Sequence, residues 1–244
     1  MACRSLGTIL AIFLICNPAE AARNAPLPAG QQQQPAVGRD GYLYQLFIPR
    51  AAASSHNQRW PLMIFLHGSG ERGDDIARVK VHGPPKVADR DPGFPFILIA
   101  PLLPAEQDWD IAKLNAILDN ALKTLPVDRS RVYLTGLSRG GHATWKWAAA
   151  EPHKFAAVAP VAGRGDPATA CALKAKPVWA FHGDRDDVVI PEGSFAMVRA
   201  IRACGGSPRL TIYPDVGHNS WDPAYEDPAL YLWLLSHRLQ EPPR

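Results

Sequence analysis

The chain has 244 residues, of which 47% are hydrophobic and 20% are charged, and its formal net charge is +3. This length suits one sizeable hydrophobic core and is short for two full-sized domains. The 24 prolines and 19 glycines make up about 18% of the residues, below the share typical of a low-complexity disordered chain. Because the basic surplus is small and no dense basic run occurs, nucleic acid and anionic membrane surfaces are not expected as partners.

The N-terminal segment has the pattern of a secretory signal peptide. Arg4 precedes an apolar run from Leu6 to Cys16, and small residues follow up to Ala21. We expect cleavage after Ala21, which makes residues 1–21 the signal peptide and the mature protein periplasmic or secreted. The apolar run is shorter than the about 20 residues that a membrane-spanning helix needs, so no stable membrane anchor is expected. A lipoprotein site at Cys16 and an N-terminal core helix are weaker alternatives.

Export changes the meaning of the four cysteines, which are too far apart in the sequence to suggest a zinc site. Cleavage removes Cys3 and Cys16 and leaves Cys171 and Cys204 in an oxidising compartment. A disulfide between these two is then a candidate, and two buried thiols are the alternative.

The segment 22–40 contains three prolines and a run of four glutamines, and it has no apolar periodicity. Such a composition is typical of a flexible leader. No internal repeat and no second composition block follows it. We therefore expect one domain, over residues 41–244.

Short apolar runs alternate with helical patterns through the rest of the chain. Continuous apolar runs without alternation are typical of strands in a parallel sheet that is covered on both faces. Apolar residues at helical spacing predict the helices between them. The alternation predicts right-handed crossovers and a doubly wound, mostly parallel α/β sheet flanked by helices. The expected strands are 42–48, 61–66, 96–100, 131–135, 156–160, 178–181 and 210–213, and the expected helices are 111–125, 140–150, 192–203 and 224–239.

A candidate nucleophile, Ser138, stands in the run Gly136–Gly140 (GLSRG), between a predicted strand and a predicted helix. A sharp strand-to-helix turn exposes the hydroxyl above the sheet, and glycines on both sides leave room for the turn. The helix N-terminus also directs backbone N–H groups at developing negative charge. The pattern alone is weak, and its position between strand and helix is what makes it specific.

A candidate acid and a candidate base follow in chain order. After the strand 178–181 come three aspartates, Asp184, Asp186 and Asp187, any of which could orient a histidine, although a charged turn would also contain such residues. His218 lies after the strand 210–213 and before the final predicted helix. The order Ser, Asp, His is the one expected of α/β-hydrolases.

An oxyanion hole is the remaining requirement of such a site. The run His67–Gly70 (HGSG) ends the strand 61–66, and a glycine-rich turn there can direct the N–H of Ser69 at the reacting oxygen. The N–H of Arg139 would be the second donor. A plain glycine turn is the alternative.

Five ordered segments resemble the phospholipase/carboxylesterase branch of the α/β-hydrolases. Within that branch they are more closely similar to the exported members described as predicted peptidases or dienelactone-hydrolase-like esterases. The resemblance covers roughly residues 41–240 and rests on PLMIFLHGSGERGDD (61–75), KVHGPPK (80–86), RVYLTGLSRGGHATW (131–145), PVWAFHGDRDDVV (177–189) and YPDVGHNSW (213–221).

The resemblance implies a compact α/β-hydrolase with little or no lid, acting on small-molecule esters of small to medium acyl groups without a metal or organic cofactor. Its H-G-x-x-D pattern implies Asp186 as the acid, with Asp187 as second choice. Arg139 stands where relatives more often have Met or Gln, which suggests an effect on substrate charge preference. The spacing of Cys171 and Cys204 also resembles that of exported relatives, which favours the disulfide.

Three other functions remain open at this point. The first is a serine peptidase of the prolyl-oligopeptidase type, although 244 residues leave no room for the propeller that usually accompanies it. The second is a polymer esterase that acts on feruloyl, acetyl-xylan or polyhydroxyalkanoate esters. The third is a catalytically inactive binding protein on the same fold, against which the presence of all three triad residue types argues.

Overall fold

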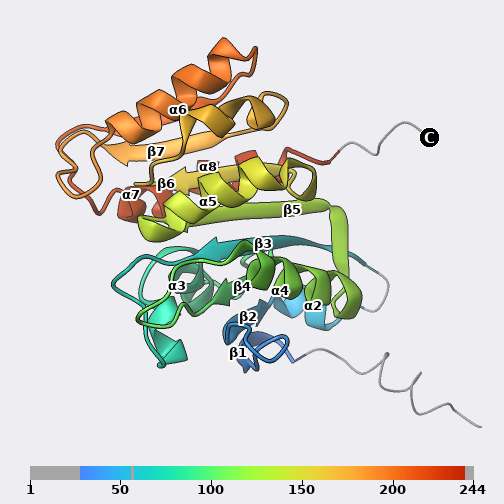
Figure 1. Ribbon diagram of the computed structural model, residues 1–244. Coiled ribbons are helices and arrows are strands. Elements are labelled where there is room, and N and C mark those ends of the chain that lie inside the picture. Colours follow the sequence, from blue (N-terminus) through green and yellow to red (C-terminus); the bar gives the residue numbers. More distant parts are fainter. Residues whose placement is uncertain (1–27, 56–57, 240–244) are drawn as a thin grey trace, which may run out of the picture.

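The computed structural model describes residues 28–55 and 58–239 (Figure 1). Its centre is an eight-stranded sheet in the order β1-β2-β4-β3-β5-β6-β7-β8. The pairs β1–β2 and β2–β4 are antiparallel, and every other pair is parallel. The predicted doubly wound, mostly parallel α/β sheet is therefore confirmed. The predicted signal peptide lies outside the described residues.

The elements have the following bounds. The strands are β1 (Gly30–Gln34), β2 (Tyr44–Ile48), β3 (Trp60–Leu66), β4 (Ile97–Pro101), β5 (Val127–Leu137), β6 (Ala157–Val161), β7 (Trp179–Gly183) and β8 (Arg209–Tyr213). The α-helices are α2 (Arg50–Ala53), α3 (Gly83–Arg90), α4 (Ile111–Thr124), α5 (Arg139–Ala150), α6 (Glu192–Ala203), α7 (Trp221–Glu226) and α8 (Pro228–Leu235), and the 3₁₀ helices are η1 (Ile76–Lys80), η2 (Pro152–Lys154) and η3 (Pro167–Leu173).

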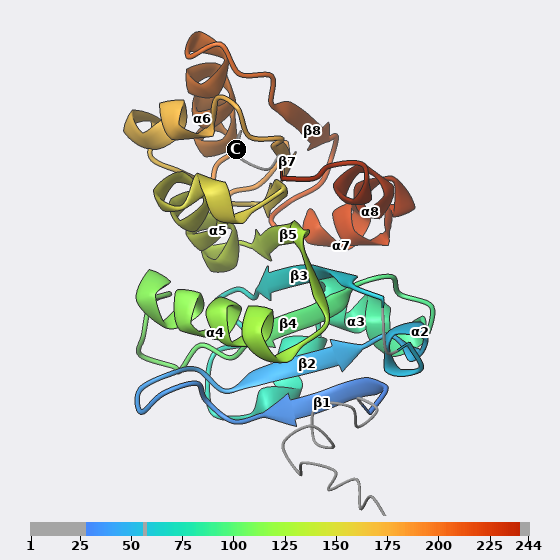
Figure 2. The ribbon, with the colours of Figure 1, turned by 90° about the vertical axis from the view of Figure 1, so that its right-hand side faces the viewer.

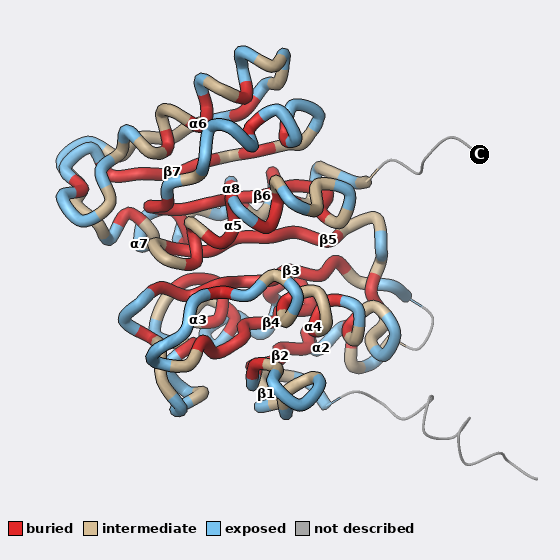
Figure 3. The backbone as a smooth tube through the Cα atoms, viewed as in Figure 1, coloured by how far each residue is buried: buried red, intermediate tan, exposed pale blue. Residues whose placement is uncertain are grey.

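Helices cover both faces of the sheet, as its continuous apolar strands require. Figure 2 shows α4, α5 and α6 on one face and α3, α7 and α8 on the other. Each face has its own buried cluster, with Leu118, Trp147 and Ile201 on the first and Phe96, Tyr225 and Leu230 on the second. Figure 3 shows the buried strands between helices whose outer surfaces are exposed.

The expectation of a flexible leader over 22–40 is wrong for part of that segment. Gly30–Gln34 forms β1, which pairs antiparallel with β2 in the register Gly30↔Ile48 to Gln34↔Tyr44. An edge strand needs only backbone hydrogen bonds on one side, so glutamine side chains do not prevent it. The Gln31 side chain also donates to the carbonyl oxygen of Pro85 at 2.8 Å. The domain therefore begins before residue 41.

The expectation of one final helix over 224–239 is also wrong, because the chain forms α7 and α8 instead. Asp227 separates them: its carboxylate accepts the N–H of Ala229 at 2.8 Å, and Pro228 occupies the first turn of α8. An aspartate N-cap followed by proline favours the start of a new helix, α8, over a continuation of α7. The helix α3 was not expected because Pro84 and Pro85 suggest a loop, yet both lie in its first turn, where proline is tolerated.

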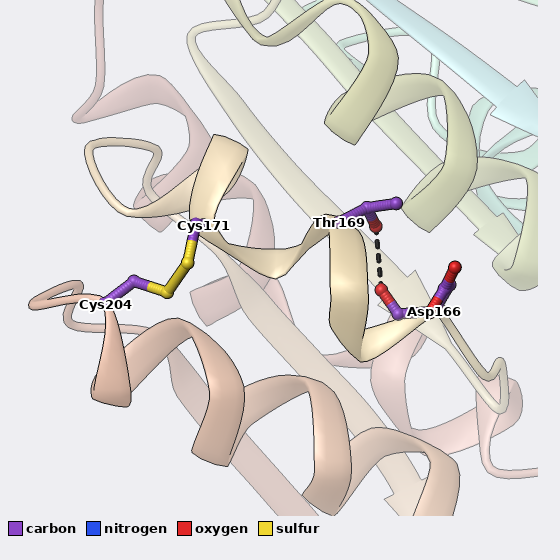
Figure 4. The surroundings of a disulfide bond; sticks show 4 residues. All are labelled: Asp166, Thr169, Cys171 and Cys204. Carbon is purple, nitrogen blue, oxygen red and sulfur yellow. Dashed lines mark hydrogen bonds between the residues drawn. A yellow bond between two sulfur atoms is a disulfide. The ribbon is translucent and has the colours of Figure 1, made fainter.

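The structure contains the expected disulfide (Figure 4). It joins Cys171 in η3 to Cys204, the residue directly after α6, with 5.3 Å between the two Cα atoms. At the start of η3 the hydroxyl of Thr169 donates to the carbonyl oxygen of Asp166 at 2.7 Å. The bridge therefore ties the end of α6 to the segment that follows β6.

Across the two described ranges, none of the helices is both long and apolar enough to cross a lipid bilayer. The carboxyl ends of the parallel strands β3, β5 and β7 lie along one edge of the sheet, on the left in Figure 1. β8 is parallel to β7, so its carboxyl end lies at the same edge. The loops at this edge carry Ser138, Asp186 and His218.

Candidate active site

Ser138 lies at the turn between β5 and α5, with φ of 51° and ψ of −117°. A positive φ is uncommon for a residue with a side chain, and such strain is typical of the turn that exposes a nucleophile. A Cβ at Gly136 or at Gly140 would collide with backbone atoms, so the turn requires glycine at both positions. The sequence GLSRG folds here as the pattern predicts.

Two hydrogen bonds connect the three predicted triad residues. His218 Nε2 lies 2.9 Å from Ser138 Oγ, and His218 Nδ1 lies 2.7 Å from Asp186 Oδ2. The loops after β7 and β8 are joined by the N–H of Arg185, which donates to the carbonyl oxygen of Val216 at 3.0 Å. Residues from three strand ends thus meet in the arrangement of a nucleophile, a base and an orienting carboxylate.

Of the three aspartates after β7, only Asp186 faces the histidine. It is 3% exposed, whereas Asp184 and Asp187 are exposed in the same loop. Its second carboxylate oxygen accepts the N–H groups of Val188 and Val189, at 3.0 and 2.9 Å. A buried carboxylate that is held from both sides can fix the orientation of the imidazole beside it.

The turn after β3 is held by two side chains that the sequence reasoning did not use. The carbonyl oxygen of Gly68 lies 2.7 Å from His67 Nδ1, and the N–H of Gly68 donates to Glu71 Oε2 at 2.9 Å. The N–H of Leu103 donates to His67 Nε2 at 3.0 Å, so His67 carries its hydrogen on Nδ1. Because both polar groups of Gly68 are engaged, the turn is fixed next to Ser69, the predicted oxyanion donor.

The side chain of Arg139 is engaged within the cleft. Its Nε donates to Ser69 Oγ at 2.9 Å, and its Nη1 forms an ion pair with Asp108. The backbone N–H of Arg139 belongs to the first residue of α5, where helix geometry leaves the N–H without an intrahelical acceptor. The side chain therefore braces the Ser69 turn, and its charge is offset by Asp108.

A cleft of about 480 Å³ lies over Ser138. A second hollow of about 370 Å³ adjoins it and shares His142, Arg164, Val188 and Val189 as walls. Between β6 and β7 the described chain inserts only η3, and between β7 and α6 it forms no further helix or strand. The first cleft is lined by Ser69, Asp108, Trp109, Ser138, Arg139, His142, Ala143, Lys146, Arg164, Val188 and Val189.

His142 is a cleft residue that the sequence reasoning missed. It lies one helical turn after Ser138, and its Nδ1 accepts the N–H of Arg164 at 2.8 Å. Burial, with the nearby charge of Arg164, lowers the pKa of His142 to about 4. The ring is therefore neutral at pH 7 and carries its hydrogen on Nε2. Helical spacing from Ser138 could have identified it, because residues four apart share a helix face.

The described residues offer no metal site: in 28–55 and 58–239 no group of three or more His, Cys, Asp or Glu side chains is arranged to hold an ion. A serine hydroxyl within hydrogen-bond distance of an imidazole that a buried carboxylate orients is an arrangement capable of nucleophilic acyl transfer.

Comparisons with known proteins agree with this fold. A bifunctional acetylxylan esterase/xylanase of Neocallimastix patriciarum is 27% identical over 165 residues, which are 65% of this chain and 23% of that protein. The crystal structure of a thermostable esterase has a TM-score of 0.74 at 28% identity, over 85% of this chain and 63% of that one. A ferulic acid esterase has a TM-score of 0.65 at 17% identity, over 84% and 95% of the two chains, a likeness that shows the fold alone.

The chain spans only 23% to 37% of the length of the curated relatives that it matches. The family model described as "Dienelactone hydrolase family" matches residues 105–227, about half of the chain. That range contains Ser138, Asp186 and His218, the three residues that the structure brings together. The chain belongs to the dienelactone hydrolase family.

Proposed function

We propose that this protein is a serine carboxylesterase that hydrolyses esters of small to medium acyl groups. The observation that carries the proposal is the pair of hydrogen bonds that links Ser138 Oγ to His218 and His218 to the buried Asp186. Membership of a hydrolase family supports it, as does a cleft of about 480 Å³ directly over the serine.

In the first half of the reaction, Ser138 Oγ attacks the ester carbonyl carbon while His218 Nε2 takes the hydroxyl proton. Asp186 holds the imidazole in the required tautomer and stabilises the imidazolium. The N–H groups of Ser69 and Arg139 donate to the oxyanion of the tetrahedral intermediate. His218 then gives its proton to the leaving alkoxide oxygen, the carbon–oxygen bond breaks, and the acyl group stays on Ser138.

In the second half, water attacks the acyl-enzyme carbonyl and His218 takes a proton from that water. Collapse of the second intermediate breaks the bond to Ser138 Oγ, which regains a proton from His218. The products are the carboxylic acid and the free enzyme. No cofactor enters either half.

The substitution Ser138→Ala tests the proposal directly. We expect hydrolysis of p-nitrophenyl acetate to fall by at least about 10³-fold, because the nucleophile is lost and only binding and oxyanion contacts remain. A fluorophosphonate probe should label the wild-type protein and leave Ser138→Ala unlabelled. The exposed Ser207→Ala variant is the matched control and should behave as wild type. Near-normal turnover by Ser138→Ala would refute the proposal.

A polymer esterase is the second candidate, and the acetylxylan esterase named among the relatives favours it. The adjoining hollow, which extends the cleft away from Ser138, is a feature that a long substrate could use. A substrate panel separates the candidates: p-nitrophenyl esters of increasing acyl length, acetylated xylan, methyl ferulate and short peptide anilides. Release of acetate from xylan above the rate for small esters would favour the polymer esterase, and cleavage of the anilides would favour a peptidase.

We further propose that the protein is exported. The disulfide Cys171–Cys204 supports this, because structural disulfides persist in oxidising compartments. Mass spectrometry of the protein from the periplasm and the culture medium should give an N-terminus at Ala22. An uncleaved protein that remains with the cytosol would contradict export.

A further inference from the structure

His182 lies behind the acid of the triad and is fully buried. It is part of β7, and its Nε2 lies 2.6 Å from the carbonyl oxygen of Val189 and 3.1 Å from Asp186 Oδ2. This is the same carboxylate oxygen that faces His218. The imidazoles of His182 and His218 therefore share one oxygen of Asp186.

These contacts determine which nitrogen of His182 carries the hydrogen. A carbonyl oxygen and a carboxylate oxygen are both acceptors, so an Nε2 that lies close to both must be a donor. Burial lowers the pKa of His182 from its usual value, which favours the neutral ring. The neutral ring then has its single hydrogen on Nε2, and Nδ1 is an acceptor.

The other side of the ring is held by Ser194 of α6. Its Oγ lies 2.7 Å from His182 Nδ1 and 3.1 Å from the carbonyl oxygen of Gly163. With Nδ1 as an acceptor, the single hydroxyl hydrogen of Ser194 is shared between Nδ1, at the shorter distance, and the carbonyl oxygen of Gly163. The side chain of Ser194 is 1% exposed, so water does not compete for this bond. The ring is thus held on both of its nitrogens.

We propose that His182 is a positioning residue, whose Nε2–H holds the Asp186 carboxylate in the plane that His218 requires. The proposal rests on the function proposed above. Three hydrogen bonds hold Asp186: two backbone N–H groups donate to Oδ1, and His218 lies on Oδ2. The Nε2–H of His182, which also faces the carbonyl oxygen of Val189 at 2.6 Å, adds a polar contact of 3.1 Å to Oδ2. A carboxylate with donors on both oxygens is restrained from turning away from the catalytic histidine.

The same contact also affects the charge that His218 experiences. A carboxylate that loses a donor directs more of its negative charge at its remaining partner, which favours the imidazolium form of His218. A base must be neutral to accept the proton of Ser138, so the enzyme would then need a higher pH to work. The titratable groups that face this pair are Asp186 between the two rings and His142 beside His218.

The kinetic test compares His182→Leu, which removes the donor, with His182→Gln, whose amide can donate from a similar distance. Rates are expressed per active site, counted by fluorophosphonate titration. For His182→Leu we expect kcat to fall about tenfold with KM little changed, and the acid limb of kcat/KM to move up by about 0.5–1 pH unit. For His182→Gln we expect most of kcat and the position of that limb to be restored.

A packing role would give a different result. If His182 only fills space, His182→Leu would lower the melting temperature or the number of active sites, and the surviving sites would keep the wild-type pH profile. That outcome overturns the inference. So does a His182→Gln variant that is as impaired and as shifted as His182→Leu.

A second measurement does not depend on turnover. In a Ser138→Ala background, NMR titration of the His218 ring should show protonation at higher pH after His182→Leu and at the original pH after His182→Gln. His153→Leu, which removes an exposed histidine, serves as the control and should leave the His218 signal in place. An unchanged His218 titration overturns the inference on His182 alone, whereas an active Ser138→Ala protein overturns the proposed function.

Discussion

The α-carbon of Gly140 faces the carbonyl oxygen of Leu66 so closely that a Cβ there would lie 1.9 Å from that oxygen. Leu66 is the last residue of β3, and Gly140 belongs to the first turn of α5, the helix that starts after Ser138. The contact is between backbones, so no side chain can move aside to relieve it. Ser138 can therefore occupy its position only because residue 140 is a glycine and has no Cβ atom.

For Gly140→Ala we expect α5 to be pushed away from β3 and Ser138 to leave the reach of His218. Esterase activity should fall by about 100-fold or more, since misplacement by about 1 Å is enough for such a loss. Activity per milligram and the melting temperature are the measurements. Gly93→Ala is the matched control, because the nearest atom to its Cβ, at 3.1 Å, belongs to the side chain of Asp91. A Gly140→Ala protein with normal activity would contradict this account of the turn.

The two neighbouring aspartates should differ sharply on substitution. Asp186→Asn keeps the shape of the side chain but removes the charge that stabilises the imidazolium, so kcat should fall by about 10³–10⁴-fold. Asp187→Asn changes an exposed side chain in the same loop and should cost less than about threefold. Steady-state kinetics of both purified variants measure these losses. A larger fall in kcat for Asp187→Asn than for Asp186→Asn would assign the role of the triad acid to Asp187.

The charge of the cleft should influence which esters are preferred. Arg164 and Lys146 line the cleft, and no carboxylate of the described residues lies within 4.0 Å of either side-chain cation, whereas Arg139 is paired with Asp108. An ester that carries a free carboxylate should therefore react better than a neutral ester of equal length, and added salt should reduce the difference.

Arg164→Ala tests this preference. We expect kcat/KM for p-nitrophenyl hemisuccinate to fall by about 5- to 10-fold, and kcat/KM for p-nitrophenyl butyrate to stay the same. Arg90→Ala, which removes an exposed cation paired with Glu226, is the control. Equal losses on the charged and the neutral ester would show that Arg164 acts on the shape of the cleft and has no effect on charge selection.

Acid should destabilise the protein through His67. Burial lowers the pKa of His67 to about 4, although its hydrogen bond to Gly68 acts in the opposite direction. In the unfolded chain an ordinary histidine has a pKa of about 6.5, so the unfolded state binds more protons between these two values. The free energy of unfolding should therefore decrease from pH 6.5 to pH 4, by on the order of 2–3 kcal/mol from this residue, and level off below.

Urea unfolding at a series of pH values measures this slope. His67→Gln should be less stable at neutral pH and should show a flatter dependence between pH 6.5 and 4. His153→Gln, at an exposed position, should keep the wild-type slope. If the free energy of unfolding of His67→Gln kept the full wild-type dependence on pH, the loss of stability in acid would have to come from groups other than His67.

Removal of the disulfide should affect stability and leave the chemistry intact. The bridge joins residues 33 apart, and cross-links of that span stabilise by about 3–4 kcal/mol through the unfolded state. The double variant Cys171→Ser/Cys204→Ser should unfold at lower urea concentration, and reductant should lower the wild type to the same level. Activity per active site at 25 °C should persist in both. A wild type insensitive to reductant would contradict a stabilising role.

The parts of the fold that the sequence predicted are those that depend on apolar patterning. All seven expected strands exist, and α4, α5 and α6 lie within one residue of their expected bounds. The elements that were missed depend on backbone geometry: the strand Gly30–Gln34 is held by pairing with β2, and α3 begins with prolines that are tolerated only in a first turn.

The residues of the site also fall into two groups: those that a local sequence pattern predicts and those that depend on contacts in the folded chain. Ser138 and His218 could be predicted because motif and chain order are local properties of the sequence. The choice of Asp186 over its neighbours depends on which side chain a loop buries, and it came from a family resemblance. His142 and Arg164 come together only because β6 ends next to α5, a contact that no local pattern records.

The strand Gly30–Gln34 has a further consequence, for the behaviour of the protein in concentrated solution. β1 covers the hydrogen-bonding side of β2 that would otherwise be the outer margin of the sheet. In a shortened chain that begins at residue 41, the strand Tyr44–Ile48 would have unpaired backbone N–H and C=O groups along its outer side. Such groups can form hydrogen bonds with a strand of another molecule. The glutamine-rich segment that reads as dispensable thus replaces the largely apolar outer strand Tyr44–Ile48 with a polar one.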